Sequence, residues 1–211
     1  MSIKTILFDF DGTLIDTNDL IYESFMHTFE QYGYSFTKEE ILQFNGPPLQ
    51  KTFSTINPHL AEEMIRTYRA YNNEHHDEYV ALFPNVRETL DILKDKDFKL
   101  AIVSAKMRDG VKQGLKATNI ENYFDTIISI DDVLNPKPHP ESVYKALDNL
   151  YAKAEEAIMI GDNYHDIEAG NKAGTKTAGV SWSTKGVAYL QRYNPTYMLH
   201  DMTDLLEILG V

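Results

Sequence analysis

The sequence contains no cysteine among its 211 residues. This absence excludes disulfide bonds, thiol nucleophiles and zinc sites built from cysteine thiolates. Long apolar runs are also missing, because no stretch approaches the roughly 20 apolar residues that a helix needs to cross a bilayer. The first residues, 1–4, lack the apolar segment of a signal peptide. We therefore expect a cytoplasmic protein that does not associate with membranes.

Positive charge is scarce as well. The chain carries 20 Lys and Arg residues against 32 Asp and Glu residues, which gives a formal net charge of −12. Such a surface repels nucleic acid, and no basic tract compensates locally, so we expect no nucleic-acid partner. A substrate that carries phosphate must then be bound by a few local cations, a metal ion or backbone N–H groups. Hydrophobic residues make up 43% of the chain, which is enough for a buried core.

The pattern of apolar residues divides the chain into two parts. A nearly continuous apolar run over residues 4–8 predicts a strand that is buried on both faces. Between residues 17 and 80 apolar residues recur at helical spacing, and no strand is expected. From residue 81 onward strands alternate with helices, with strands expected at 98–104, 126–130, 157–162, 176–181 and 196–199. This pattern predicts an α/β fold with a doubly wound parallel sheet in residues 1–16 and 81–211, and an inserted all-helical domain in residues 17–80.

In a doubly wound sheet the functional site lies beyond the carboxyl ends of the strands, where the strand order reverses. Polar residues stand at or just after the predicted strand ends: Asp9, Asp11, Ser104, Asp131, Asp132 and Asp162. Asp9 and Asp11 are two positions apart in an extended segment, so their side chains point to the same side. Gly12 follows them and permits a sharp turn. The sequence therefore predicts a site in which crowded carboxylates bind a cation.

Three further features suit phosphate and metal binding. Ser104 precedes a predicted helix, and the free N–H groups of that helix can bind an oxyanion together with the Ser104 hydroxyl. The neighbouring Lys106 could assist, although we interpret it rather as a surface residue. Prolines on both sides hold the backbone around Lys137, so this cation loses less entropy on meeting a phosphate. Asp162 and Asp166 add carboxylates, and oxygen atoms are the ligands that Mg²⁺ prefers. The seven histidines are scattered without the spacing of a transition-metal site.

These motifs resemble those of the haloacid dehalogenase superfamily. The stretch DFDGTLIDT is similar to the superfamily's first motif, and Ser104, Lys137 and the segment 161–170 match the later motifs in order. The resemblance implies that Asp9 is the nucleophile, that Asp11 is the general acid and base, and that Ser104 and Lys137 assist. It also implies a Mg²⁺ cofactor with the ligands Asp9, Asp11 (through its main-chain carbonyl), Asp162 and Asp166. The second aspartate favours phosphoryl chemistry, because the superfamily's dehalogenases lack it.

The helical insert is similar in position to the superfamily's small helical cap. The resemblance implies that the substrate contacts are Gly12, Thr13, Ser104, Ala105 and Lys137 and, in the cap, Gly46 and Pro47. Further cap candidates are Lys51, Thr52, Arg66 and Arg69, although the basic residues among them are better explained as solvated helix charges. The segments MSIKTILFDFDGTLIDTN, FNGPPLQKTF and AIMIGDNYHDIEAGNKAGTKTAGVSW are most similar to bacterial inorganic pyrophosphatases of the superfamily, which are close to phosphoglycolate phosphatases. We expect a monomer that hydrolyses pyrophosphate through an aspartyl-phosphate.

Several alternatives stay open at this point. The substrate could instead be phosphoglycolate, a nucleoside monophosphate or a sugar phosphate, and a phosphomutase also needs both aspartates of the first motif. A phosphorylatable receiver places similar residues at strand ends, but it lacks a helical insert after its first strand. A binding protein without activity would be expected to have lost one of the motif residues Asp9, Asp11, Lys137 or Asp162.

Overall fold

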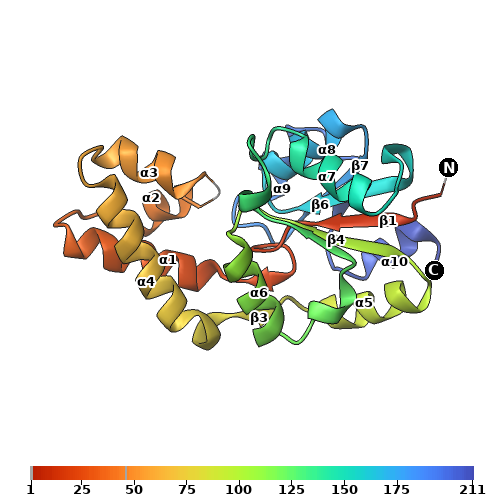
Figure 1. Cartoon of the computed structure of the whole chain (residues 1–211), viewed down its shortest axis with the longest axis horizontal. Coiled ribbons are helices and arrows are strands. Elements are labelled where there is room, and N and C mark those ends of the chain that lie inside the picture. Colours follow the sequence, from red (N-terminus) through yellow and green to blue (C-terminus); the bar gives the residue numbers. More distant parts are fainter. Residues whose placement is uncertain (1, 46) are drawn as a thin grey trace. The chain divides into compact units, whose positions relative to one another are not determined.

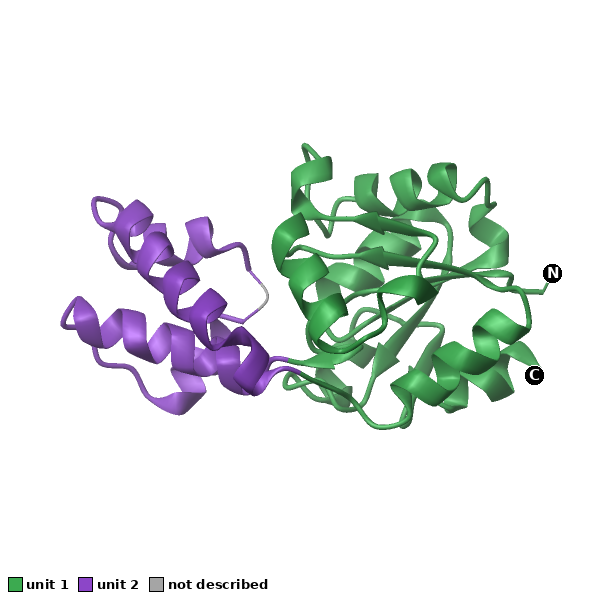
Figure 2. Cartoon of the chain, turned by 60° about the horizontal axis from the view of Figure 1, so that its bottom comes forward, with its two compact units in different colours: residues 1–16, 81–211 green, residues 17–80 purple. Residues whose placement is uncertain are grey.

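The computed structural model of the protein describes residues 2–45 and 47–211, which form two compact units (Figures 1 and 2). The first unit comprises Met1–Asp16 and Ala81–Val211, and the second comprises Thr17–Val80. The first unit contains a parallel sheet with helices, and the second is helical. The predicted class, an α/β fold with a helical insert, is confirmed.

Six parallel strands form the sheet of the first unit. Their order is β5 (Thr126–Ile128), β4 (Lys99–Val103), β1 (Thr5–Phe8), β6 (Ala157–Gly161), β7 (Lys176–Val180) and β8 (Tyr197–Leu199). Leu7 of β1 lies opposite Ala101 of β4 on one side and Met159 of β6 on the other. The chain proceeds outward from β1 to β5 and then returns to β6 on the other side of β1. The strand order therefore reverses beside β1, and a site is expected at the carboxyl ends of β1, β4 and β6.

Both faces of the sheet are covered by helices. All four residues of β1 are buried, as its apolar run predicts. Alternate residues point to opposite faces, so that Leu7 packs with Val143 of α7 (Glu141–Asn149) and Ala169 of α8 (Tyr164–Ala173) in one core cluster. Figure 1 shows α7 and α8 on one face of the sheet, and α5 (Val86–Asp95) and α10 (Asp204–Leu209) on the other.

The strands end close to their predicted bounds. The strand expected at 98–104 spans Lys99–Val103, and the one expected at 126–130 ends at Ile128. This second strand stops early because Ser129 begins a capped 3₁₀ turn, in which the Asp132 carboxylate accepts hydrogen bonds from both the N–H and the hydroxyl of Ser129. The remaining helices of this unit are α6 (Arg108–Ala117) and α9 (Val187–Gln191).

The described residues of the second unit form four α-helices, drawn in purple in Figure 2. They pack around a core that is rich in aromatic side chains. The helices are α1 (Asn18–Gln31), α2 (Lys38–Gln43), α3 (Leu49–Ile56) and α4 (Ala61–Tyr79). Phe25 and Phe29 are four residues apart on α1 and face Phe53 of α3, with ring centroids 5.6 and 5.9 Å from it. Tyr68 of α4 closes the cluster at 4.7 Å from Phe25. Among the helices of residues 2–45 and 47–211, none is both long and apolar enough to cross a membrane.

A two-stranded ribbon lies where the chain leaves and re-enters the first unit. Its strands, β2 (Ile15–Asp16) and β3 (Ala81–Leu82), pair antiparallel. The sequence interpretation missed this ribbon. Each strand has two residues, too few to show a periodic pattern, and the partners are far apart in the chain.

Candidate active site

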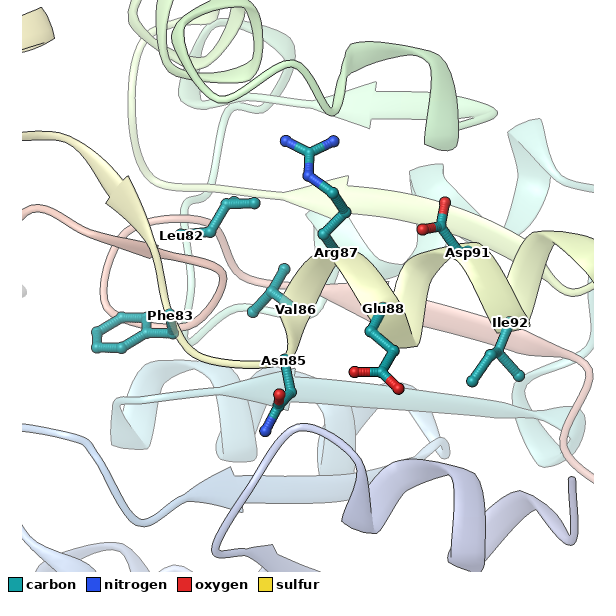
Figure 3. Close-up of a pocket in the computed structure, with 8 residues that line it drawn as sticks. All are labelled: Leu82, Phe83, Asn85, Val86, Arg87, Glu88, Asp91 and Ile92. Atoms are coloured by element: carbon teal, nitrogen blue, oxygen red, sulfur yellow. The ribbon is translucent and has the colours of Figure 1, made fainter.

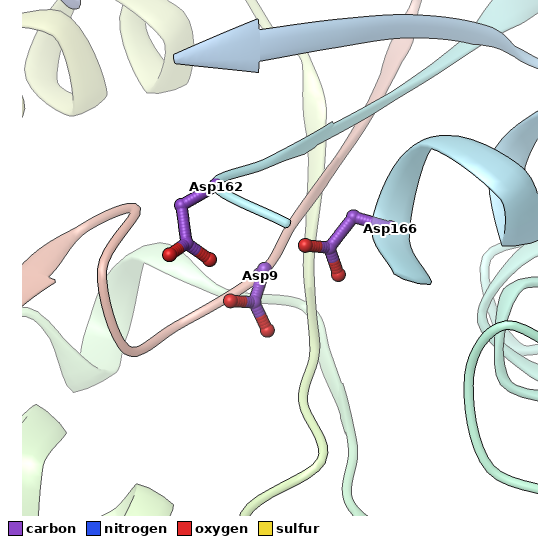
Figure 4. A group of neighbouring side chains, drawn as sticks. All are labelled: Asp9, Asp162 and Asp166. Carbon is purple, nitrogen blue, oxygen red and sulfur yellow. The ribbon is translucent and has the colours of Figure 1, made fainter. Parts of the chain in front are cut away.

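Three carboxylates from different parts of the chain meet at the carboxyl ends of β1 and β6 (Figure 4). Asp9 directly follows β1, Asp162 directly follows β6, and Asp166 lies in the first turn of α8. One carboxylate oxygen from each lies within 4.8 Å of the other two, and all three residues are buried. The Asp9 N–H donates to the Ile160 carbonyl at 2.8 Å, so that the ladder between β1 and β6 fixes the base of the site.

Lys137 neutralises part of this charge from the loop before α7. Its side chain is 4% exposed, and its ammonium group donates to Asp9 Oδ1 at 2.8 Å, to Asp166 Oδ1 at 2.5 Å and to the carbonyl of Val103 at 2.8 Å. The three acceptors match the three N–H donors of an ammonium group. The peptide bond between Lys137 and Pro138 is cis. The proline-flanked lysine is thus held against the carboxylates that follow β1 and begin α8.

The electrostatics of the cluster favour an additional cation. Burial raises the pKa of the Asp9 carboxyl to about 7, although the Lys137 charge opposes this change. Burial raises the pKa of Asp162 well above its ordinary range, and the Asp9 charge is the second-largest cause of this increase. Burial alone would lower the pKa of Lys137, but the charges of Asp166 and Asp9 outweigh it and the pKa rises. Three carboxylates with one ammonium retain excess negative charge, and their oxygen atoms could hold a metal ion.

Two glycines make room for this close approach. Gly12 has a φ of +80°, and a Cβ placed on it would lie 2.5 Å from Asp162 Oδ2. A Cβ on Gly161 would lie 2.2 Å from the Cβ of Asp166. Both distances are far shorter than a van der Waals contact. A side chain at either position would displace a carboxylate of the cluster.

Asp11, the second aspartate of the first motif, is held by a lysine. Its Oδ1 accepts from Lys106 Nζ at 2.8 Å, and the Lys106 N–H donates to the Ser104 hydroxyl oxygen at 3.1 Å. Ser104 is 5% exposed. The interpretation of Lys106 as a surface residue is wrong, because four fifths of its side chain is buried and its charge is paired beside the carboxylate cluster.

The other predicted contacts of this unit differ in accessibility. Ala105 is exposed between Ser104 and Lys106. Thr13 is fully buried, and its hydroxyl has no hydrogen-bond partner within the described part of the chain. The substrate-binding role of both residues stays a prediction.

Asp131 and Asp132, which follow β5, do not join the cluster. The Asp131 carboxylate accepts the N–H of Arg108 at 2.7 Å, and Asp132 accepts the Arg108 guanidinium at 2.5 Å. Burial would raise the pKa of the Asp132 carboxyl, but the hydrogen bonds from Ser129, and after them the bond from Arg108, outweigh burial and hold this pKa below its ordinary value. β5 is an edge strand, separated from β1 by β4. The two aspartates therefore stabilise the connection to α6 instead of the site.

The cap residues of the sequence prediction belong to the helical unit. Pro47 is half-buried in the connection between α2 and α3, and Gly46 lies outside the described residues. Thr52 is buried on α3. The remaining candidates are exposed on α3 and α4: Lys51, Arg66 and Arg69. Their contact with a substrate stays a prediction.

The sequence interpretation missed the loop that follows β7. The Ser183 hydroxyl donates to the carbonyl of Asp162 at 2.6 Å, and the Trp182 indole N–H donates to the carbonyl of Thr13 at 3.3 Å. The Trp182 ring also packs on Phe83, with centroids 5.8 Å apart. Burial lowers the pKa of Lys185 in the same loop, although the Asp162 charge opposes this. The strand-end rule could have found these residues, because β7 ends immediately before them.

A separate, shallow pocket of about 600 Å³ lies along β3 and the start of α5 (Figure 3). The residues that line it are Leu82, Phe83, Asn85, Val86, Arg87, Glu88, Asp91 and Ile92. The Arg87 guanidinium donates to the carbonyls of Thr118 and Asn119, which follow α6. None of the strand-end carboxylates lines this pocket. The pocket is therefore distinct from the carboxylate cluster.

The parallel sheet and its strand-end carboxylates correspond to a known family. The family described as haloacid dehalogenase-like hydrolase matches residues 6–180. The chain therefore belongs to the haloacid dehalogenase-like hydrolases, and it is an enzyme.

Relatives of this family match the chain over its full length. The pyrophosphatase PpaX of Anoxybacillus flavithermus is 54% identical over 212 residues, covering 100% of this chain and 99% of the relative. The protein of the same name from Bacillus velezensis is 54% identical over 210 residues, covering 99% and 97%. A haloacid dehalogenase-like hydrolase from Streptococcus pneumoniae has a similar structure, with a TM-score of 0.87, 29% identity and 97% of each chain covered.

Proposed function

We propose that the protein is a Mg²⁺-dependent phosphohydrolase that forms an aspartyl-phosphate on Asp9 and that its substrate is inorganic pyrophosphate. The observation that carries the reaction is the position of Asp9, at the strand-order reversal and bonded to Lys137, beside two further carboxylates. The substrate is supported by relatives named pyrophosphatase that are 54% identical over the whole chain.

In the first step an Asp9 carboxylate oxygen attacks one phosphorus atom of pyrophosphate. The bond between that phosphorus and the bridging oxygen breaks, and the electron pair stays with the leaving phosphate. Asp11 donates its proton to the leaving oxygen. Lys137 favours ionised Asp9 as the nucleophile, and the Ser104 hydroxyl binds the transferring phosphoryl group.

In the second step a water molecule attacks the phosphorus of the aspartyl-phosphate. Asp11 takes a proton from this water, the bond between phosphorus and the Asp9 oxygen breaks, and the second phosphate leaves. One pyrophosphate and one water thus yield two phosphates, and both aspartates return to their starting protonation states. The one residue serves as acid and then as base because it loses a proton in the first step and regains one in the second.

Mg²⁺ fits the donor set, which consists of carboxylate oxygens from Asp9, Asp162 and Asp166 and the proposed carbonyl oxygen of Asp11. When bound, the ion neutralises charge on the phosphoryl oxygens. Asp166 already accepts from Lys137 through Oδ1 and from the N–H of Asn163 through Oδ2. Both of its oxygens thus have a structural role in addition to any contact with the ion. We further propose that residues 17–80 act as the cap that selects the substrate.

Removal of metal is expected to stop phosphate release and to lower thermal stability. In excess EDTA, turnover should fall to background and return with added Mg²⁺, and the Tm at pH 8 should rise with Mg²⁺ concentration because the ion binds the folded state. The Asp162→Asn variant should lose most of the Tm response. Asp148→Asn, a change on the exposed surface of α7, should keep it. Undiminished turnover in EDTA would refute the metal assignment.

A side-by-side substrate panel tests the proposed substrate. Phosphate release from pyrophosphate, phosphoglycolate, nucleoside monophosphates and sugar phosphates is measured at equal enzyme concentration with Mg²⁺. We expect kcat/KM to be highest for pyrophosphate. If kcat/KM is higher for any phosphomonoester, that compound replaces pyrophosphate as the proposed substrate, and the proposed reaction through an aspartyl-phosphate is unaffected.

A further inference from the structure

Lys106 is built into the turn that carries the phosphate-binding serine. Its N–H donates to the Ser104 hydroxyl oxygen at 3.1 Å, and its carbonyl accepts the N–H of Ile130 at 3.2 Å. These two bonds connect the backbone of Lys106 to the ends of β4 and β5. The start of its side chain is therefore fixed relative to Ser104.

The stem of Lys106 lies along the first turns of α6, over Gly110. A Cβ on Gly110 would lie 2.9 Å from Cε of Lys106, and 3.2 and 3.3 Å from its Cγ and Cδ. Glycine inside a helix is less favourable than alanine. Here the missing methyl group leaves the space that the lysine stem occupies. The path of the Lys106 side chain thus depends on Gly110 as well as on the backbone of Lys106 itself.

The head of Lys106 reaches the proposed acid. Nζ lies 2.8 Å from Asp11 Oδ1, and the two side chains are 19% and 22% exposed. An ammonium group has three N–H donors, and the bond to Asp11 takes one of them. Lys137, by contrast, is buried and donates to three protein acceptors. The site therefore has two lysines: Lys137, which is bonded to the proposed nucleophile Asp9, and Lys106, which lies beside the proposed acid Asp11.

The position beside Asp11 is the side from which the leaving group departs, because Asp11 gives its proton to the leaving oxygen. A leaving phosphate is an anion throughout the reaction, whereas an ester of a neutral alcohol brings no such charge. A half-buried cation at this place therefore stabilises a leaving phosphate more than a leaving group derived from a neutral alcohol. The need for a local cation is strong, because the chain as a whole carries a net charge of −12.

We infer that the Lys106 ammonium group binds the anionic leaving group of the substrate and so selects pyrophosphate over esters of neutral alcohols, with Gly110 making room for its stem. The inference rests on the proposed function, since it assigns the leaving group of the same reaction. It adds a specificity-determining residue outside the carboxylate cluster.

The test compares kcat/KM for pyrophosphate with kcat/KM for glycerol 3-phosphate, an ester of a neutral alcohol, as a ratio, in the Mg²⁺-loaded enzyme. A hydrogen bond to a charged group contributes about 1.5–3 kcal/mol, so the ratio should fall about tenfold to hundredfold in Lys106→Gln. Lys106→Arg keeps the charge and should keep most of the ratio. Lys112→Gln makes the same charge change on the exposed surface of α6 and should leave the ratio unchanged.

Gly110→Ala provides a second variant that does not threaten folding, because alanine favours the helix. Its methyl group displaces the Lys106 stem, and the ratio should fall in the same direction. An equal loss for both substrates in Lys106→Gln, or an unchanged ratio, would overturn the inference. If the wild-type enzyme does not hydrolyse pyrophosphate, the proposed substrate is wrong. The ratio is then measured with phosphoglycolate instead of pyrophosphate, because the leaving group of phosphoglycolate carries a carboxylate.

Discussion

Replacement of Asp9 by asparagine is expected to lower the rate of phosphate release by at least about a thousandfold, because removal of a catalytic nucleophile can cost about a millionfold. The amide has nearly the same shape as the carboxylate but cannot attack phosphorus to form an acyl phosphate. Single-turnover measurement with pyrophosphate and Mg²⁺ checks this result. Asp148→Asn serves as the control, because it makes the same chemical change at an exposed position. A variant that keeps more than about a tenth of the wild-type rate would exclude Asp9 as the nucleophile.

The same variant is expected to melt at a higher temperature than the wild type when metal is absent. Burial raises the pKa of Asp9 from 3.8 to about 7 in the folded protein. The folded state therefore holds the proton more tightly than the unfolded state, and the stability that Asp9 contributes falls as the pH rises from about 4 to 7. Asparagine carries no such charge at any pH.

Thermal unfolding in EDTA between pH 4 and pH 8 measures this effect. The gain in Tm of Asp9→Asn should be largest at pH 8 and should shrink towards pH 4. A lower Tm than wild type at pH 8 would mean that the bond between Asp9 and Lys137 outweighs the cost of burying the carboxylate.

Replacement of Lys137 by methionine should produce the largest loss of stability. The Lys137 side chain is 4% exposed and its ammonium group donates to Asp9 and Asp166, so its removal leaves buried carboxylates without a cation. Loss of one partner of a buried ion pair costs about 3–5 kcal/mol. We expect this decrease in the free energy of unfolding at pH 8 in EDTA, measured by urea denaturation. Added Mg²⁺ should restore part of it, because the ion supplies positive charge to the same carboxylates.

Lys94→Met is the matched control for Lys137→Met. Lys94 pairs with Asp125 at 3.0 Å, but both side chains are more than a third exposed. An exposed pair of this kind contributes at most about 1 kcal/mol. If the two methionine variants lose equal stability, Lys137 does not have the electrostatic role described here.

Local patterns and the strand-end rule predicted most residues of the candidate site, and the remaining residues depend on long-range pairing. A buried apolar run followed by two aspartates placed Asp9 at a strand end, and the same rule placed Asp162. It also selected Asp131 and Asp132, because sequence patterns do not reveal that β5 is an edge strand. Their carboxylates bind Arg108 instead.

Other features depend on neighbours that are distant in the sequence. In the sequence Lys106 resembles any lysine near the start of a helix. Only its pairing with Asp11, 95 positions away, shows that it belongs to the candidate site. Ser183 likewise reaches Asp162 through the pairing of β6 with β7. The strand-end rule points to the loop after β7, but single-sequence patterns carry no information on which loops become neighbours, so the contacts themselves could not be predicted.

Trp182 gives this enzyme a built-in optical probe. It is the one tryptophan of the chain, and it lies between the carbonyl of Thr13 and the ring of Phe83, all within the α/β unit. Tryptophan fluorescence therefore reports the melting of this unit alone, whereas far-ultraviolet circular dichroism includes the helices of residues 17–80. Coincident transitions by the two methods would show that both units unfold together, and separate transitions would give each unit its own stability.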